Sequence, residues 1–154
     1  MKLSSKARYA IEAMLELAVS PRRPVTLASI SQHQGISQSY LEQLFMHLRK
    51  SGLIQGARGP GGGYRLGRDA AAITVADVVV AVDEHANPSN AGEARASQRG
   101  EGGPARELWD DLSHRIFDFL GSITLAQLVE DCWGQHRQSA SREARHSFEH
   151  SKAA

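Results

Sequence analysis

The stretch Arg58-Gly59-Pro60-Gly61-Gly62-Gly63-Tyr64-Arg65-Leu66 decides the fold, because it places a loop almost free of side chains between two arginines. Glycine tolerates positive φ and proline fixes φ near about −65°, so this composition favours a tight turn. Apolar residues at Leu53-Ile54 before the loop and at Tyr64 to Leu66 after it supply short strands. The stretch therefore predicts a β-hairpin with an irregular tip, of a kind that can lie against DNA.

Phosphate-binding loops of enzymes are the natural rivals for a glycine-rich segment. A P-loop needs a lysine followed by a hydroxyl residue, and a dinucleotide fingerprint needs a helix that opens directly after the glycines. Neither feature is present here. On the loop alone, a hairpin tip with a purely structural role stays open beside a ligand-binding role.

Two capped helices are predicted before the hairpin. Thr26 is placed to cap a helix over residues 27–34 that ends at Gly35. Ser37 is placed to cap a second helix over residues 38–51, which Gly52 ends. The second helix has a core-facing stripe of Leu41, Leu44, Phe45 and Leu48. Packing alone could produce such a pair, but the basic hairpin that follows favours a helix-turn-helix with a wing.

Other segments complete the predicted domain. A first helix opens at Ser4 or Ser5 and runs to about Val19, with a broad apolar face that closes the core. After the hairpin, Thr74 caps residues 75–83, for which a helix is preferred over a strand because of the cap and the Ala-Asp start. The fold class predicted is mainly α with a small β-wing: a winged helix-turn-helix domain over residues 1–84 plus a long dimerisation helix.

Charge is divided unevenly along the chain. The net charge is +1, but residues 1–70 hold ten Lys or Arg against four Asp or Glu, whereas residues 71–154 hold eight against thirteen. This asymmetry predicts a phosphate-binding face on the first part and a binding affinity that falls as salt rises.

Residues 1–84 resemble the IscR-like family of bacterial winged-helix regulators of iron-sulfur cluster assembly. The strings that carry the resemblance are Leu3-Ser4-Ser5-Lys6-Ala7-Arg8-Tyr9-Ala10, Ser37-Gln38-Ser39-Tyr40-Leu41-Glu42-Gln43-Leu44-Phe45, Leu48-Arg49-Lys50-Ser51-Gly52-Leu53, Arg58-Gly59-Pro60-Gly61-Gly62-Gly63-Tyr64 and Ala81-Val82-Asp83-Glu84. The resemblance implies a homodimer on palindromic operator DNA, with base contacts near the start of the second helix of the pair and Arg58 in the minor groove.

Residue types agree with those implied roles. Glu42 can accept a hydrogen bond from the cytosine N4 amine, whereas hydrogen-bond acceptors and phosphates elsewhere in the groove repel its carboxylate. Glu42 can therefore discriminate between operator types, and Gln43 can pair with adenine. Tyr40 either contacts DNA or packs against the helix before it. The residues predicted to contact DNA are Lys2, Arg8, Ser37, Gln38, Ser39, Tyr40, Glu42, Gln43, Arg49, Lys50, Arg58 and Gly59.

The last third of the chain supplies a predicted partner surface within residues 106–134. A stripe along a helix over residues 106–120 is too apolar to stand alone; it consists of Leu108, Leu112, Ile116, Phe119 and Leu120. We expect it to pack against the same helix of a second subunit, and packing on its own winged domain is the alternative. Gly121 is expected to end this helix, and Thr124 to open a shorter helix through a capping box. Residues 135–154 are few in apolar side chains, and we expect them to be disordered.

The segment 85–105, a sensor-type loop, departs from the family. Its relatives that sense a [2Fe-2S] cluster hold it there with three cysteines and a histidine, whereas this segment has no cysteine and offers only His85. Iron-sulfur clusters need thiolates, so none is expected in this sequence, nor another metal. Either the regulator works without a cluster, under a protein or small-molecule partner, or a parent with a [2Fe-2S] cluster has had its cysteines replaced at Ala91, Ser97 and Ala105. Cys132, far downstream, is most simply a lone thiol.

Composition sets the remaining bounds. With 154 residues, one cysteine, no long apolar run and no signal-peptide pattern, the chain is expected to be a cytoplasmic protein that does not enter the membrane. An enzyme is disfavoured because the residues show no nucleophile-base pair and no metal-ligand spacing. A cluster carrier or interaction module is the third class, and it would show no preference for a DNA sequence.

Overall fold

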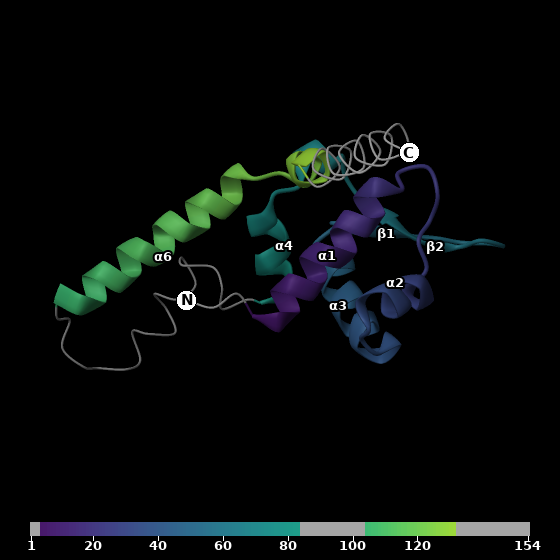
Figure 1. Cartoon of the computed structure of the whole chain (residues 1–154), viewed down its shortest axis with the longest axis horizontal. Coiled ribbons are helices and arrows are strands. Elements are labelled where there is room, and N and C mark those ends of the chain that lie inside the picture. The colour runs from purple at the N-terminus through teal and green to yellow at the C-terminus, as the bar shows by residue number, and fades with distance from the viewer. Residues whose placement is uncertain (1–3, 84–103, 132–154) are drawn as a thin grey trace, which may run out of the picture.

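The computed structural model describes residues 4–83 and 104–131, which form a helical body with a hairpin and one long helix projecting from it (Figure 1). The elements in chain order are α1 (Ser5–Val19), α2 (Leu27–Gln34), α3 (Gln38–Lys50), β1 (Ile54–Ala57), β2 (Gly63–Leu66), the 3-10 turn η1 (Ala70–Ala72), α4 (Val75–Val82) and α6 (Pro104–Ser122), followed by a helical segment at residues 125–131. The described sheet has two antiparallel strands. The predicted fold class, mainly helical with a small β-wing, is confirmed.

Local capping sets the boundaries of α2 and α3, as the sequence predicts. The Thr26 hydroxyl accepts a hydrogen bond from the Ser29 N–H at 3.2 Å, and the Ser37 hydroxyl accepts one from the Tyr40 N–H at 3.3 Å. Between the two helices, Gly35 adopts φ +65°, a left-handed conformation that L side chains rarely take. These caps satisfy backbone N–H groups that would otherwise lack partners at each helix start.

The core lies between α1, α3 and α4. The predicted stripe of α3 is buried, with Phe45 among the largest fully buried side chains, and α1 contributes Met14 and Leu17. Residues 75–82 form a helix rather than a strand, because the side chains of Thr74 and Asp77 each bond to the other residue's backbone N–H in a capping box. The valines at positions 75, 78, 79 and 82 are buried in the same core, whereas Val80 is only partly buried.

The hairpin is held to the helical body by a third stretch of chain. β1 pairs with β2 in the register Ala57 opposite Gly63, and Val25, just before α2, exchanges two backbone hydrogen bonds with Tyr64, at 2.9 and 2.8 Å. Leu53, predicted as part of the strand, precedes β1 instead, because its N–H donates to the Leu48 carbonyl at 3.0 Å and closes the end of α3. The Leu53 side chain is buried. The strand therefore starts at Ile54 and runs further than predicted.

The long helix α6 differs from the prediction at both ends. It begins at Pro104, because proline has no N–H to satisfy and suits the first turn of a helix. Gly121 does not end it: the helix continues to Ser122, and Gly121 is not among the described glycines with positive φ. A glycine ends a helix only where the chain needs the left-handed conformation, and here the chain turns after Ser122 instead.

A small backbone clasp joins the end of α6 to the helical body. The Val75 N–H donates to the Ile123 carbonyl at 2.9 Å, and the Leu125 N–H donates to the Ile73 carbonyl at 2.9 Å. Leu125 is fully buried. The predicted capping box at Thr124 is confirmed, since its hydroxyl accepts from the Gln127 N–H at 3.2 Å and the Gln127 side chain accepts from the Thr124 N–H at 2.9 Å. The far end of α6 extends away from the body on the side opposite the hairpin (Figure 1).

Candidate nucleic-acid interface

The outward face of α3 carries most of the predicted DNA contacts. Gln38, Ser39, Glu42 and Gln43 are exposed, whereas the neighbouring Leu41 and Leu44 are buried in the core. This division follows from the period of about 3.6 residues per helical turn, which keeps the polar set on one side. The face combines amide, hydroxyl and carboxylate groups, which is the chemistry that distinguishes base edges in a major groove.

Tyr40 is partly buried, and its ring meets Tyr9 of α1 edge to face, with the centroids 6.1 Å apart. Arg8 lies over the Tyr9 ring at 5.1 Å from its centroid. An aromatic contact between α1 and α3 thus places the exposed Arg8 near the start of α3. The packing role for Tyr40 is present, with α1 rather than α2 as its partner, and half-burial leaves part of the side chain open to solvent.

Other predicted contacts lie elsewhere on or around α3. The Ser37 hydroxyl is engaged as the helix cap. Arg49 and Lys50 are exposed at the opposite end of the helix from Gln38, about 18 Å along its axis by a rise of about 1.5 Å per residue. Lys2 falls outside the described residues. The structure therefore groups Arg8 with the first half of α3 and separates Arg49 and Lys50 from them.

Met46 belongs to the same outward face, although it is not among the residues predicted to contact DNA. It is 62% exposed and follows Glu42 by four residues and Gln43 by three, the spacing that stacks side chains on one side of a helix. The signal was available in the sequence: Met46 lies outside the apolar stripe of α3. Its exposure adds an apolar group to an otherwise polar face.

The wing tip presents Arg58 and Gly59 to solvent. Gly59 and Gly61 take φ of +102° and +74°, and the Gly62 N–H bonds to the Gly59 carbonyl at 2.9 Å to close the turn. In β2, one residue pair from the loop, the Tyr64 ring packs edge to face on Phe45 of α3 with centroids 4.8 Å apart. This contact sets the angle between the wing and α3, because Phe45 is itself fixed in the core.

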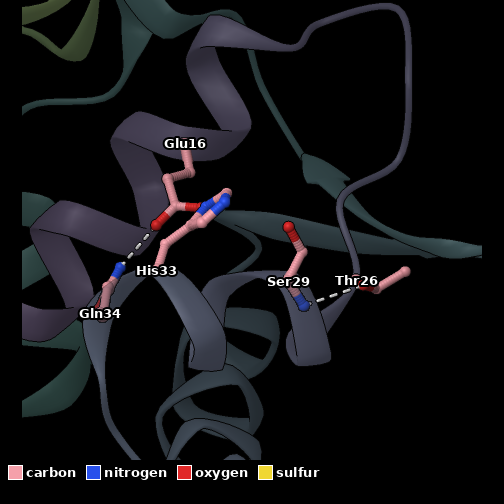
Figure 2. A network of polar contacts seen from close by, with 5 residues as sticks. All are labelled: Glu16, Thr26, Ser29, His33 and Gln34. Atoms are coloured by element: carbon pink, nitrogen blue, oxygen red, sulfur yellow. Dashed lines mark hydrogen bonds and ion pairs between the residues drawn. The ribbon is translucent and has the colours of Figure 1, made fainter.

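A polar network fixes α2 against α1, as Figure 2 shows. The Glu16 carboxylate lies between two side chains of α2: one oxygen is 3.1 Å from His33 Nδ1 and the other accepts from Gln34 Nε2 at 3.0 Å. Ser31 adds a bond from its hydroxyl to the Ile36 carbonyl in the turn, at 2.6 Å. No local sequence pattern predicts the two Glu16 contacts, because His33 and Gln34 lie seventeen and eighteen residues further along the chain. They hold the helix that precedes α3 in a fixed orientation.

The apolar stripe of α6 divides into an open part and a covered part. Leu108, Leu112 and Phe119 are 65%, 40% and 64% exposed, and Trp109 beside them is 59% exposed. Ile116 and Leu120 are partly buried, and Leu120 packs against the core of its own chain. The alternative of packing on the winged domain thus holds for Leu120, while Leu108, Trp109, Leu112 and Phe119 form an apolar surface that the single chain leaves uncovered.

Metal-ligating groups do not gather in the part of the chain that the structure describes, where no three His, Cys, Asp or Glu side chains could hold one ion. Of the three positions proposed as former cysteines, Ala105 falls in the first turn of α6, and Ala91 and Ser97 lie outside the described residues, as do Cys132 and residues 135–154. Among the described helices, none has the length and apolar character needed to cross a membrane.

Comparison with known proteins identifies the family. Residues 3–131 match the Rrf2 family model, described as an iron-dependent transcriptional regulator. The HTH-type transcriptional regulator IscR of Xenorhabdus nematophila is 54% identical over 132 residues, which cover 85% of this chain and 80% of that protein. IscR of Vibrio cholerae is 52% identical over 132 residues, covering 85% of this chain and 76% of that one.

Solved structures agree with this assignment. The structure of T. potens IscR superposes with a TM-score of 0.71 at 34% identity, over 86% of this chain and 88% of that one. CymR, the global cysteine regulator of B. subtilis, gives a TM-score of 0.71 at 35% identity, over 84% and 97%. The chain therefore belongs to the Rrf2 family, as a DNA-binding transcriptional regulator similar to IscR and not an enzyme.

Proposed function

We propose that the protein binds palindromic operator DNA as a homodimer, with α3 of each subunit in the major groove and the wing in the flanking minor groove. The observation that supports this most is the fixed relation between two exposed surfaces: the polar face of α3 and the arginine-bearing tip, joined through Phe45 and Tyr64. Two rigidly linked surfaces can read one half-site without reorganisation. The compartment is then the cytoplasm, where bacterial DNA lies.

Three side chains would set sequence preference in this arrangement. Gln43 can bond to the N6 and N7 edge of adenine, and Glu42 can accept only from a donor such as cytosine N4. Glu42 would therefore reject operators that present acceptors at its position. Arg58 would enter the minor groove, where the potential is most negative when the groove is narrow.

Selection of binding sites from random duplexes tests this proposal. The protein is expected to enrich two inverted half-sites, and the Glu42→Ala variant is expected to enrich a looser consensus at the base that the carboxylate contacts. Recovery of no shared sequence, with only salt-dependent binding to any duplex, would instead favour an interaction module or carrier.

Arg58→Ala is expected to weaken binding to the selected operator by about 10- to 100-fold, the loss typical of one groove contact. It should also lower the slope of log K against log salt by about one, because one fewer cation meets the phosphates. Fluorescence anisotropy across a salt series measures both quantities.

Arg115→Ala is the matched control for the wing variant. This exposed arginine pairs with Asp111 at 2.8 Å on α6, a helix that extends away from the body on the side opposite the hairpin (Figure 1). Removal of Arg115 changes the net charge by the same amount as removal of Arg58. Equal losses in the two variants would show that charge alone, and not the wing contact, drives binding.

The residues of this chain do not fit the [2Fe-2S] cluster that related sensors hold. The whole sequence holds one cysteine, Cys132, and residues 85–105 hold none, whereas such clusters are bound mainly by thiolates. We propose that regulation here runs through a protein or small-molecule partner, or that Ala91, Ser97 and Ala105 stand where a parent protein has cysteines.

Anaerobically purified protein is expected to show no visible absorption bands of a [2Fe-2S] cluster and no stoichiometric iron. A variant with cysteines at positions 91, 97 and 105 provides the comparison, because restored ligands would bring back colour only if those positions match the parent loop. Strong visible absorption by the unaltered chain would overturn the cluster-free proposal.

A further inference from the structure

A cavity of about 770 Å³, open to solvent, lies where the end of α3 meets α4 and α6. Its size falls in the range of small-molecule sites, about 300–1,000 Å³. One part of its wall is apolar and includes Leu53, Val80 and Phe117. Neither the outward face of α3 nor the wing contributes to it, so the proposed DNA contacts leave this volume unused, apart from Lys50 at the end of the helix.

The charged residues of the cavity wall favour an anion. Lys50 and Arg68 contribute two cations, and His47 lies beside them. Of the five N–H donors of Arg68, the structure assigns one, on Nη2, to the Ser51 carbonyl at 3.0 Å. Asp77 is the acidic lining residue, but one oxygen of its carboxylate accepts the Thr74 N–H at 2.9 Å in the cap of α4. That hydrogen bond holds the carboxylate in the helix cap but leaves its negative charge, so Lys50, Arg68 and Asp77 together give the wall one net positive charge.

The cavity is also separate from the exposed stripe of α6. Phe117 follows Leu112 by five residues, so the two side chains leave the helix about 140° apart. A second subunit packed on Leu108 and Leu112 would therefore leave Phe117 and Gly121 facing their own α4. We therefore expect the cavity to stay accessible in the proposed dimer, and its lining comes from both the helix that would read DNA and the helix that would join the subunits.

We propose that this cavity binds a small monocarboxylate with an apolar body, and that the bound acid alters DNA affinity by fixing α6 relative to α3. The carboxylate would meet Lys50 and Arg68, and the apolar body would lie against Phe117 and Val80. The proposed binding of the acid is inferred from the cavity alone, whereas the proposed change in DNA affinity rests on the proposed function. A ligand shifts such an equilibrium only by its different affinity for the two arrangements of α6.

Nuclear magnetic resonance of the full-length, ¹⁵N-labelled protein tests binding with four probes: butanoate, hexanoate, phenylacetate and the neutral phenylacetamide. At least one acid is expected to give saturable shifts at cavity amides such as Ala76, Ala81 and Gly121, with a Kd of about 0.1–1 mM. Phenylacetamide should bind at least about tenfold more weakly than phenylacetate, because it lacks the charge. Absence of saturable shifts with all three acids, or equal binding of the amide, overturns the proposal.

A pair of variants at Gly121 separates occupancy of the cavity from damage to the fold. A Cβ built at Gly121 meets only the Ala76 Cβ, at 3.9 Å, which is ordinary contact. Gly121→Leu is therefore expected to fold, to fill the cavity and to abolish acid binding, whereas Gly121→Ala should retain it. Arg68→Gln keeps a donor for the Ser51 carbonyl without the charge, and it should lose affinity for the acid at least about tenfold but not for the amide. Unchanged acid binding by Gly121→Leu places the ligand elsewhere and contradicts the proposal.

DNA titrations with and without saturating acid test the regulatory part. Operator affinity is expected to change by about threefold or more in the unaltered protein and not in Gly121→Leu. If no operator is bound at all, the proposed function fails while the resonance titration still decides the cavity. If the acid binds and operator affinity is unchanged, the link to regulation fails.

Discussion

Replacing Leu112 by aspartate (Leu112→Asp) is expected to turn a dimer into a monomer and to lower affinity for a palindromic operator by about 100-fold or more. Leu112 lies in the middle of the exposed stripe of α6 and is 40% exposed in the single chain, so the charge costs the fold little. In a dimer the same carboxylate would be buried against apolar side chains without a partner, at a cost of several kcal/mol. Light scattering gives the mass and fluorescence anisotropy gives the affinity.

His114→Asp is the control on the same helix. His114 is exposed and follows Leu112 by two residues, about 160° around the helix when measured by the shorter arc, so it lies opposite the stripe. This variant adds the same side chain and should remain a dimer with normal operator affinity. A monomeric unaltered protein at micromolar concentration, or a dimeric Leu112→Asp, would sink the proposed interface.

Local signals in the sequence are sufficient to predict the helices of the winged helix-turn-helix domain. Thr26, Ser37 and Thr74 act through atoms three residues away, so their caps can be recognised without the rest of the fold. Gly35 ends α2 for an equally local reason, its left-handed backbone. Gly121 shows the limit of this reasoning: the residue type permits a helix end, but the clasp at Ile123 decides where α6 stops.

Contacts between distant segments account for what the sequence left open. The sequence leaves two roles open for Tyr40, contact with DNA or packing, and only the fold shows Tyr9 of α1 beside it. Glu16 has partners seventeen and eighteen residues away, so no periodicity points to them. The cavity between α3, α4 and α6 belongs to the same class, because its charged and apolar walls come from three separate parts of the chain.

Replacing Gly63 by alanine (Gly63→Ala) is expected to destabilise the protein by about 2–3 kcal/mol and to loosen the wing. A Cβ at this position would lie 2.5 Å from the Val25 carbonyl oxygen and 2.8 Å from its carbon, a distance that backbone atoms cannot relieve by rotating a side chain. The reason is close approach and not φ, since Gly63 is not among the glycines with positive φ. The Val25–Tyr64 hydrogen bonds would lengthen, and with them the support that Tyr64 receives on Phe45.

Gly56→Ala gives the sharpest comparison, because Gly56 lies opposite Tyr64 in the same hairpin and a Cβ there meets nothing within 4 Å. This substitution should leave the free energy of unfolding unchanged or raise it by up to about 1 kcal/mol, because alanine lowers the conformational entropy of the unfolded chain. Urea unfolding at one fixed protein concentration measures both variants, since dimer stability depends on concentration. Operator affinity should fall with Gly63→Ala and persist with Gly56→Ala; equal stability of the two variants would show that Val25 does not hold the wing. The large difference expected between two neighbouring glycines thus tests whether the backbone contact at Val25, rather than the flexibility of a glycine-rich loop, positions Arg58 for DNA.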